Sequence, residues 1–269
     1  MRATLLVEHI FRQSRVIQRI RLWHDSARID FVTELDWHES HFLLKAAFPV
    51  AIHSRDATYD IQWGTVDRPT HRRTSWDYAM FEVTGHQWCD LSEAGYGVAL
   101  MNNCKYGYDV RGNVMRLTLV KCATMPDPGA DNGRHLFTYA IYPHEGDWTN
   151  GVRAAAADLN SPVYAKPVQG RGTPGQGEPL VTVAGGPVLV ETIKPAEDRH
   201  GVIVRAYEPQ GWRGEVTFSF DRDVARIDEV NLLEDPGEVL RLSGSRAVAL
   251  SFKPHEIKTL RILFNTLED

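Results

Sequence analysis

The sequence predicts an all-β protein, and three observations carry that prediction. Apolar and polar residues alternate with a period of two in short runs along most of the 269 residues. Clusters of Gly, Pro, Asn and Asp separate these runs, as turn residues do between strands. Only residues 149–160 show a helical pattern. Many short strands with one short helix are typical of β-sandwich architectures.

The first strands are expected near the N-terminal end of the chain. Residues 20–22 and 29–31 each carry an apolar residue at every second position, and the polar segment 24–26 lies between them. This pattern predicts two antiparallel strands joined by a tight turn. Further strands are expected at 58–63, 79–88, 96–102, 114–121 and 135–142.

The single helix is expected to begin near Thr149. Its hydroxyl can accept a backbone hydrogen bond as the N-cap, and four alanines follow at 154–157. The segment 160–162, Asn-Ser-Pro, ends the helical pattern because proline cannot continue it.

A domain boundary is expected within residues 166–179, KPVQGRGTPGQGEP, which are rich in Gly and Pro and almost free of apolar residues. We therefore expect a β domain over 1–165, a linker or long loop over 166–179, and a second β domain over 180–269. Short apolar runs at regular spacing predict that the second domain is a small β-sandwich. These runs are 180–184, 187–193, 201–207, 214–220, 226–233, 245–252 and 256–264.

Composition and charge exclude several classes of partner. Lysine and arginine number 30 against 35 aspartates and glutamates, a formal net charge of -5 without a basic stripe, which disfavours nucleic acid and anionic membranes. No apolar run has the length of a signal peptide or a membrane span. Cys89, Cys104 and Cys122 lack a metal-ligand spacing, and we expect them to be reduced core residues in strands. A cytoplasmic protein is the simplest expectation.

The histidine-containing segment 38–41, His-Glu-Ser-His, invites comparison with a metal motif. A helical H-E-x-x-H places its histidines four residues apart, whereas these two are three apart in a strand-rich context and fall on opposite faces. We expect no metal here, but a polar strand end with Trp37 packed inward. Asp36 and Glu39 could form a carboxylate pair, although their spacing fixes no separation.

A mixture of groups suited to sugar recognition lies between Arg68 and Asp77. Guanidinium, imidazole, hydroxyl, carboxylate and indole groups follow one another here, and Pro69 stiffens the segment. Sugar sites combine hydrogen bonds to hydroxyls with stacking on a pyranose face. Arg68, His71, Trp76 and Asp77 are therefore candidate substrate-binding residues. The alternative is a loop held together by its own Arg–Asp pairs.

Two further segments leave a similar choice open. Tyr108 and Asp109 are expected in a turn before the strand at 114–121, where Tyr108 could stack on a sugar, but the neighbouring glycines are also ordinary turn chemistry. The loop 126–131 is rigid and doubly acidic, so an oxygen-rich cation site is conceivable there. Turn and surface-loop roles are the alternatives for both. No nucleotide-binding glycine motif and no catalytic Ser or Cys motif occurs.

Four long blocks of this sequence resemble a known family. They are DFVTELDWHESHFLLKAAFPV, QWGTVDRPTHRRTSWDYAMFEV, GHQWCDLSEAGYGVALMNNCKYGYDVRGN and MPDPGADNGRHLFTYAIYPH, and SFKPHEIKTLRILF follows near the end. In order and spacing they are similar to the C-terminal half of glycoside hydrolase family 38 α-mannosidases of the bacterial and cytosolic or vacuolar type. The resemblance implies a large β super-sandwich, similar to that of galactose mutarotase, followed by a smaller β-sandwich.

The same resemblance implies that the bond-breaking chemistry lies outside this chain. In the family, the nucleophilic Asp and the zinc ligands belong to an N-terminal α/β barrel followed by a helical bundle, and neither matches this sequence. A retaining glycosidase needs two carboxyls about 5–5.5 Å apart, and no motif here supplies them. We expect no catalytic residue, metal ligand or cofactor in this chain, with the catalytic barrel and an α-mannoside as partners.

Three functions stay open at this point. The first is the C-terminal part of a retaining α-mannosidase, which supports substrate enclosure and assembly and is inactive alone. The second is a mutarotase-like sugar epimerase that uses a His and a carboxylate as acid and base. The third is a non-catalytic carbohydrate-binding module. Surfaces meant for the barrel and bundle would be bare, so a homo-oligomer is also expected. Candidate acids for the epimerase are His53, His71, His86, His135 and His144.

Overall fold

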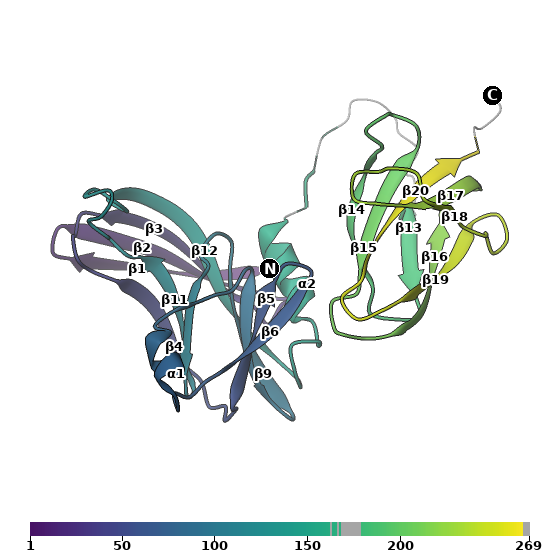
Figure 1. Ribbon diagram of the computed structural model, residues 1–269. Coiled ribbons are helices and arrows are strands. Elements are labelled where there is room, and N and C mark those ends of the chain that lie inside the picture. Colours follow the sequence, from purple (N-terminus) through teal and green to yellow (C-terminus); the bar gives the residue numbers. More distant parts are fainter. Residues whose placement is uncertain (162, 166, 168–178, 266–269) are drawn as a thin grey trace. The chain divides into compact units, whose positions relative to one another are not determined.

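The computed structural model describes residues 1–161, 163–165, 167 and 179–265. The chain forms two compact units, Met1–Ala165 and Lys166–Asp269, each with its own hydrophobic core (Figure 1). The expected linker over 166–179 falls, apart from residues 167 and 179, outside the described residues.

The first unit is built on an eight-stranded antiparallel sheet. Its strand order is β1-β2-β3-β12-β9-β8-β5-β6, so β12 joins the first three strands to the remaining four. The strands are β1 (Arg2–Phe11), β2 (Ser14–Trp23), β3 (Ile29–Trp37), β12 (Gly133–His144), β9 (Tyr96–Asn102), β8 (Trp88–Glu93), β5 (Asp56–Ile61) and β6 (Gly64–Pro69).

A smaller sheet of four strands packs against part of the first one. Its order is β4-β11-β10-β7, with β4 (Leu44–Pro49), β11 (Val114–Val120), β10 (Gly107–Arg111) and β7 (Val83–Thr84). Alternate residues of both sheets point into one shared core, because successive side chains of a strand face opposite sides. The largest side chains of this core are Trp37, Tyr59, Tyr108 and Phe137.

Two short helices complete the first unit. Helix α1 (Ser75–Ala79) follows β6 and contains no buried residue. Helix α2 (Val152–Asn160) follows β12 and buries Val152 and Ala156 in a cluster with Trp88. That cluster lies on the face of the large sheet opposite to the shared core, since it takes the alternate residues of β8, β9 and β12.

The second unit is a small β-sandwich. A three-stranded sheet has the order β13-β16-β19, and a five-stranded sheet has the order β14-β15-β20-β17-β18. Phe218, Phe252 and Leu260 lie fully buried between them. The strands are β13 (Val181–Ala184), β14 (Leu189–Pro195), β15 (Val202–Tyr207), β16 (Gly214–Phe220), β17 (Val224–Val230), β18 (Glu238–Val239), β19 (Ala247–Phe252) and β20 (Ile257–Phe264).

The all-β prediction is confirmed. The hairpin expected around residues 24–26 is the antiparallel pair of β2 and β3. The strand expected at 96–102 is β9, and the strand expected at 214–220 is β16, each with the predicted bounds. No helix in the described part of the chain is long and apolar enough to cross a membrane.

Two expectations about local structure are wrong. Residues 79–88 do not form one strand, because α1 ends at Ala79, β7 spans only Val83–Thr84, and β8 begins at Trp88. Helix α1 was not expected, and its start is fixed by a capping box between Thr74 and Asp77.

Helix α2 and two cysteines also differ from expectation. The N-cap of α2 is Gly151 rather than Thr149, at a φ of 85°, a left-handed conformation that glycine adopts without a Cβ clash. Cys89 and Cys122 are buried as expected, whereas Cys104 is exposed. Only Cys89 lies in a strand, so the expected strand position is wrong for Cys104 and Cys122. All three cysteines are free.

Candidate functional site

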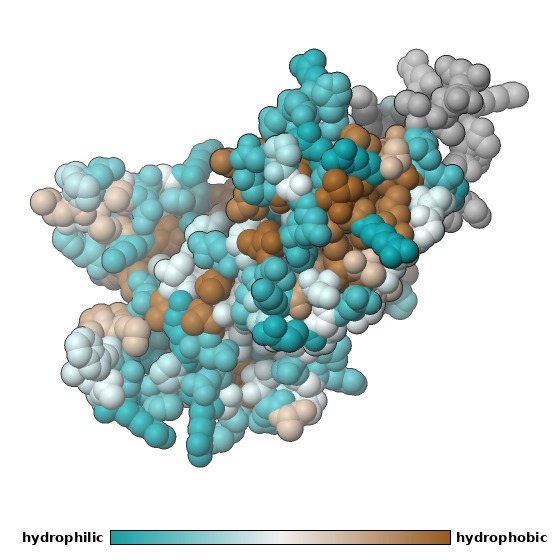
Figure 2. Space-filling model, turned by 45° about the vertical axis from the view of Figure 1, so that its right-hand side comes forward, coloured by the Kyte–Doolittle hydropathy of each residue, from teal (hydrophilic) through white to brown (hydrophobic). Residues whose placement is uncertain are grey.

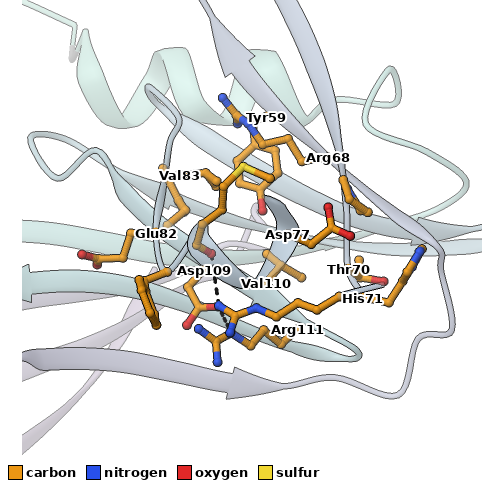
Figure 3. Close-up of a pocket in the computed structure, with 15 residues that line it drawn as sticks. Tyr59, Arg68, Thr70, His71, Asp77, Glu82, Val83, Asp109, Val110 and Arg111 are labelled. Atoms are coloured by element: carbon orange, nitrogen blue, oxygen red, sulfur yellow. Dashed lines mark hydrogen bonds and ion pairs between the residues drawn. The ribbon is translucent and has the colours of Figure 1, made fainter. Parts of the chain in front are cut away.

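A pocket beside α1 brings together most of the predicted substrate-binding residues (Figure 3). Strands β5, β6, β7 and β10 and the connection from β6 to β7 line it, and its volume is about 150 Å³. Pockets that enclose drug-sized ligands measure roughly 300–1,000 Å³, so this one has room for part of a sugar. Arg68, His71, Asp77, Tyr108 and Asp109 line the pocket.

Arg68 has free hydrogen-bonding capacity at this pocket. Strand β6 pairs it with Ala57 of β5, and its guanidinium lies over the ring of Tyr59, 4.6 Å from the ring centroid (Figure 3). Its Nη1 atom is buried without a hydrogen-bond partner among the described residues. Burial lowers the pKa of Arg68, although arginine stays protonated in proteins. A buried, unpaired N–H is costly, so a ligand oxygen at this position would be stabilising.

His71 borders two hollows in the surface. It lines the Arg68 pocket, and with Thr70 it also lines a wider hollow of about 720 Å³ that includes His53 and Arg73. Figure 3 shows His71 and Glu82 on opposite sides of the smaller pocket. The imidazole of His71 has no hydrogen-bond partner in the described part of the chain, so both ring nitrogens can contact a ligand.

Asp77 has a structural role that explains its position. Its Oδ2 atom accepts hydrogen bonds from the backbone N–H groups of Arg73 and Thr74, at 2.9 and 3.0 Å. The Thr74 hydroxyl oxygen in turn accepts from the Asp77 N–H, which completes the capping box. These bonds, first that from Arg73, lower the pKa of Asp77. Backbone groups, and not the Arg–Asp pairs considered above, therefore hold the carboxylate of Asp77.

Trp76 does not join the other predicted residues. Its side chain is 79% exposed on α1 and is not part of the pocket lining. The exposed residues Tyr78 and Phe81 accompany it on the same segment, and the Arg72 guanidinium lies 5.8 and 5.6 Å from their ring centroids. The helix thus presents Trp76 and Tyr78 next to the pocket, whereas Phe81, which follows the helix, lines the pocket.

Tyr108 and Asp109 belong to strand β10, so the expected turn is wrong. The ring of Tyr108 is fully buried and therefore presents no face on which a sugar could stack, a correction to the expected role. Its hydroxyl group donates to the carbonyl of His86 at 3.1 Å, which fixes the ring within the core. The alternation of β10 places Tyr108 inward, and the Gly107 before it belongs to the strand as well.

Asp109 is the centre of an ion network that sequence reasoning missed. Its carboxylate lies 2.9 Å from Arg111 Nε, 3.5 Å from Lys45 Nζ and 3.6 Å from Arg116 Nη1. Lys45 also lies 3.1 Å from Glu82 Oε1. Burial opposes the charge of Glu82, but hydrogen bonds from Thr118 and Lys45 outweigh it and lower the pKa of Glu82. Cross-strand register would have been needed to predict these contacts between β4, β10 and β11.

The segment 38–41 follows the end of β3, with Trp37 buried as expected. Glu39 is buried and accepts hydrogen bonds from Gln13 N and the Ser14 hydroxyl, both at 3.1 Å. Its carboxylate is therefore occupied in joining two parts of the chain, while Asp36 lies 2.9 Å from His38. Asp36 and Glu39 thus have separate partners.

The acidic loop 126–131 uses its carboxylates in hydrogen bonds to backbone N–H groups of the chain. Asp131 accepts hydrogen bonds from the backbone N–H groups of Lys121 and Cys122, and Asp127 accepts from Gly129 N. The bond from Lys121 is the largest cause of the lowered pKa of Asp131. The bond of Asp127 is ordinary Asx-turn chemistry, whereas the bonds of Asp131 tie the loop to the residues that follow β11.

A buried histidine–aspartate pair was not predicted. His144 Nε2 lies 2.7 Å from Asp90 Oδ2, and both side chains are almost completely buried. Ser92 donates to the other oxygen of Asp90. Because the two residues lie 54 positions apart, only the pairing of β12, β9 and β8 reveals the contact. Its burial closes it to a substrate.

Comparison with known proteins adds the family context. Residues 1–129 match the glycosyl hydrolases family 38 C-terminal domain, and residues 187–260 match the glycosyl hydrolases family 38 C-terminal beta sandwich domain. The chain is 41% identical over 259 residues to Alpha-mannosidase 2C1 of Mus musculus, covering 94% of this chain and 25% of that protein. It is 39% identical to Alpha-mannosidase G of Dictyostelium discoideum over 257 residues, with 93% and 24% covered.

A solved structure has a similar fold. A protein in the glycosyl hydrolase family 38 from Enterococcus faecalis superposes with a TM-score of 0.75 at 17% identity, covering 92% of this chain and 30% of that one. The chain therefore spans about a quarter of the length of the curated relatives that it matches.

Proposed function

The chain carries the C-terminal domains of glycosyl hydrolase family 38, and from this premise we propose that it is the C-terminal β region of a retaining α-mannosidase. The observation that carries the proposal is the similarity to Alpha-mannosidase 2C1, at 41% identity along 94% of the chain. In the full-length enzyme the reaction is hydrolysis of terminal α-mannosides. Since the chain spans about a quarter of such relatives, the catalytic part is its first partner.

We propose that the Arg68 pocket helps to enclose the mannoside. Its support is the unpaired, buried Nη1 of Arg68 beside a small cavity, with the uncommitted imidazole of His71 on its rim. A guanidinium offers several N–H donors to sugar hydroxyls, and an imidazole adds a donor or acceptor. Asp77 and Asp109 then position the walls, and Tyr108 supports the floor of the pocket from within the core.

The zinc that the family implies does not fit the residues of this chain. Within the described residues, no group of three or more His, Cys, Asp or Glu side chains is placed to hold a metal. We therefore assign the zinc, with the nucleophile, to the catalytic part of the full-length enzyme. This chain's contribution is binding and orientation.

The other two functions have less support. A sugar epimerase would need an accessible acid–base pair, and the pair of His144 with Asp90 is buried. The pair of His38 with Asp36 is exposed, but His38 lines neither the Arg68 pocket nor the wider hollow beside it. A stand-alone binding module would not account for similarity to α-mannosidases that extends along both units. We also propose a cytoplasmic location, which the three free cysteines support because thiols persist in a reducing compartment.

Activity of the purified chain tests the proposal. We expect no hydrolysis of an aryl α-mannoside, with or without added zinc, since the described residues hold no metal cluster and the family's nucleophile has no match. The same chain joined to the catalytic part of a relative should restore turnover. Zinc-dependent turnover by the isolated chain would contradict the proposal that catalysis belongs to another part of the enzyme, provided that the activity stays with the protein through repurification.

A further inference from the structure

The wider hollow beside the Arg68 pocket gathers arginine and histidine side chains. Its volume is about 720 Å³, and two residues of each kind line it, Arg55, Arg73, His53 and His71. Glu93 is the one acidic residue of the lining, within the part of the chain that the structure describes. Its Oε2 atom accepts a hydrogen bond from the backbone N–H of His53 at 3.1 Å. The hollow therefore has an excess of positive charge, although the formal net charge of the chain is -5.

The two arginines of this hollow lack partners of the kind that other arginines of the chain have. Hydrophilic residues cover much of the face shown in Figure 2, so charge by itself does not mark a site. Arg246, for example, lies 2.6 Å from Asp223. The side chains of Arg55 and Arg73 have no hydrogen-bond or ion-pair partner among the described residues. Their guanidinium N–H groups are therefore available to an anion in the hollow.

Backbone hydrogen bonds join the segments that form the hollow, which precede β5, follow β6 and connect β10 to β11. The N–H of Thr70 donates to the carbonyl of Arg55 at 2.9 Å, and the N–H of Gly112 donates to the carbonyl of Thr70 at 2.8 Å. The N–H of Val50 donates to the carbonyl of Asn113 at 2.9 Å. The three segments are thus fixed to one another, so binding requires little ordering of the backbone.

The hollow and the Arg68 pocket are adjoining spaces, because Thr70 and His71 line both. The smaller pocket measures about 150 Å³ and has room for part of a sugar. A substituent on that sugar would extend beyond the pocket. The wider hollow is on the other side of His71, and its unpaired cations favour a negatively charged substituent there.

We propose that the wider hollow is an anion subsite, which takes a phosphate ester carried by the sugar in the Arg68 pocket. A phosphate monoester has a charge of about −1.5 to −2 at pH 7 and three terminal acceptor oxygens. Two guanidiniums and two imidazoles offer enough donors for all three oxygens, whereas a carboxylate has only two. The inference rests on the proposed function for the identity of the sugar.

Titration calorimetry of the 269-residue chain with mannose 6-phosphate, mannose and inorganic phosphate tests the proposal. The salt concentration is kept low, because salt screens exposed charges. Mannose 6-phosphate should bind about tenfold or more tightly than either other probe. Arg55→Gln/Arg73→Gln should weaken its binding by about tenfold or more and leave the affinity for mannose unchanged. Arg213→Gln/Arg241→Gln is the matched control, since it removes two exposed arginines without described partners from the second unit.

Four results would overturn the proposal. They are no binding of mannose 6-phosphate, binding no tighter than that of mannose, binding no tighter than that of inorganic phosphate, and an equal loss in the control variant. The third would mean that the hollow takes a free anion, and the fourth that net charge and not the hollow determines affinity. Tight binding of mannose 6-phosphate that survives Arg68→Ala contradicts the proposed role of the Arg68 pocket and leaves the anion subsite standing.

Discussion

Arg68 and Asp109 lie in the same pocket but have different surroundings. Asp109 has three cationic neighbours, so its charge is already balanced within the protein. Arg68 has a tyrosine ring under its guanidinium and one buried N–H group without a partner. Buried donors in native structures nearly always have a hydrogen-bond partner. A ligand atom that accepts from Arg68 would supply the missing partner. Arg68 can therefore bind a ligand, whereas Asp109 stabilises the structure of the same pocket.

Replacing pocket residues in a full-length enzyme with this C-terminal region tests that separation. Arg68→Ala and His71→Ala should each lower kcat/KM on α-mannosides by about 10- to 100-fold, because a hydrogen bond to a charged group contributes about 1.5–3 kcal/mol. Their melting temperatures should stay near that of the parent protein. Asp109→Asn should instead reduce the free energy of unfolding by about 1–3 kcal/mol, since the buried carboxylate that Lys45, Arg111 and Arg116 share loses its charge. If activity falls only in step with melting temperature, the pocket is structural.

The buried His144–Asp90 pair predicts how stability depends on pH. Burial disfavours the imidazolium, but the hydrogen bond and charge of Asp90 outweigh it and raise the pKa of His144. A raised folded-state pKa stabilises the fold fully below the unfolded value of about 6.5. That stabilisation is lost as pH rises through the folded-state pKa.

Urea unfolding of the wild-type chain and of His144→Gln between pH 5.5 and 8.5 measures this effect. Glutamine cannot titrate, so the difference in free energy of unfolding between the two proteins should be largest at the acidic end and shrink as pH rises. A difference that stays constant with pH would show that His144 has the same pKa in the folded and unfolded states, which contradicts the raised folded-state pKa.

Strand β9 shows how one glycine allows two strands and a buried side chain to meet. Gly97 pairs directly with His144 of β12. A Cβ atom at Gly97 would lie 2.2 Å from Cε1 of His144, far inside van der Waals contact. The glycine is thus needed for close approach and not for an unusual backbone angle. The imidazole occupies the space that any other residue at Gly97 would fill.

Gly97→Ala should therefore destabilise the first unit by about 1–3 kcal/mol, the usual cost of overpacking a core. Gly95→Ala is the matched control, because a Cβ atom at Gly95 meets nothing within 4 Å. Its effect should stay within about 0.5 kcal/mol. Thermal unfolding of the two variants compares them directly, and equal melting temperatures would mean that His144 moves aside at little cost.

Strand prediction succeeded where one face of a strand is buried and the other face is exposed to solvent. Residues 214–220 alternate strictly in exposure, and the sequence shows the same alternation. β1 was missed because Leu5 and Leu6 are adjacent and both exposed, so no period of two exists there. β10 was taken for a turn because Gly107 and Gly112 lie close to Asp109 and Asn113, all common turn residues, although pairing with β11 makes residues 107–111 a strand. Pairing with neighbouring strands made both segments β-strands, although their local sequences do not favour a strand.

Candidate-site prediction had the same limit. Residues close in sequence, such as Arg68 and His71, could be recognised from their mixture of groups, and both line one pocket. Contacts between distant strands could not, since they depend on register. Lys45 with Asp109 is one case, and Asp90 with His144 is another. Trp76 was grouped with the pocket by its nearness in sequence, but a helical turn carries it outside.

At the scale of the whole molecule, the two units have separate cores. Leu100 is fully buried in the core of the first unit, and Phe218 is fully buried in that of the second. Each core is built from residues of its own unit only, among the residues that the structure describes. Proteins with more than one core often unfold in more than one step.

Calorimetry of two core variants checks this. Phe218→Ala should destabilise the second unit by about 3–5 kcal/mol, because a large buried ring leaves a cavity. The transition of the first unit should stay in place. Leu100→Ala should do the reverse, at a cost of about 2–5 kcal/mol. If either variant shifts a single transition of the whole chain, the units unfold as one cooperative body.

The central place of β12 in the large sheet has a consequence for biosynthesis. The strand order β1-β2-β3-β12-β9-β8-β5-β6 leaves the first three strands without their neighbour until the ribosome has made β12. β3 ends at Trp37 and β12 begins at Gly133, so 95 residues lie between them. Translation at about 5–20 residues per second makes this a wait of roughly 5–20 s. During that time the hairpin of β1 and β2 with β3 is a nascent three-stranded ribbon with bare apolar side chains.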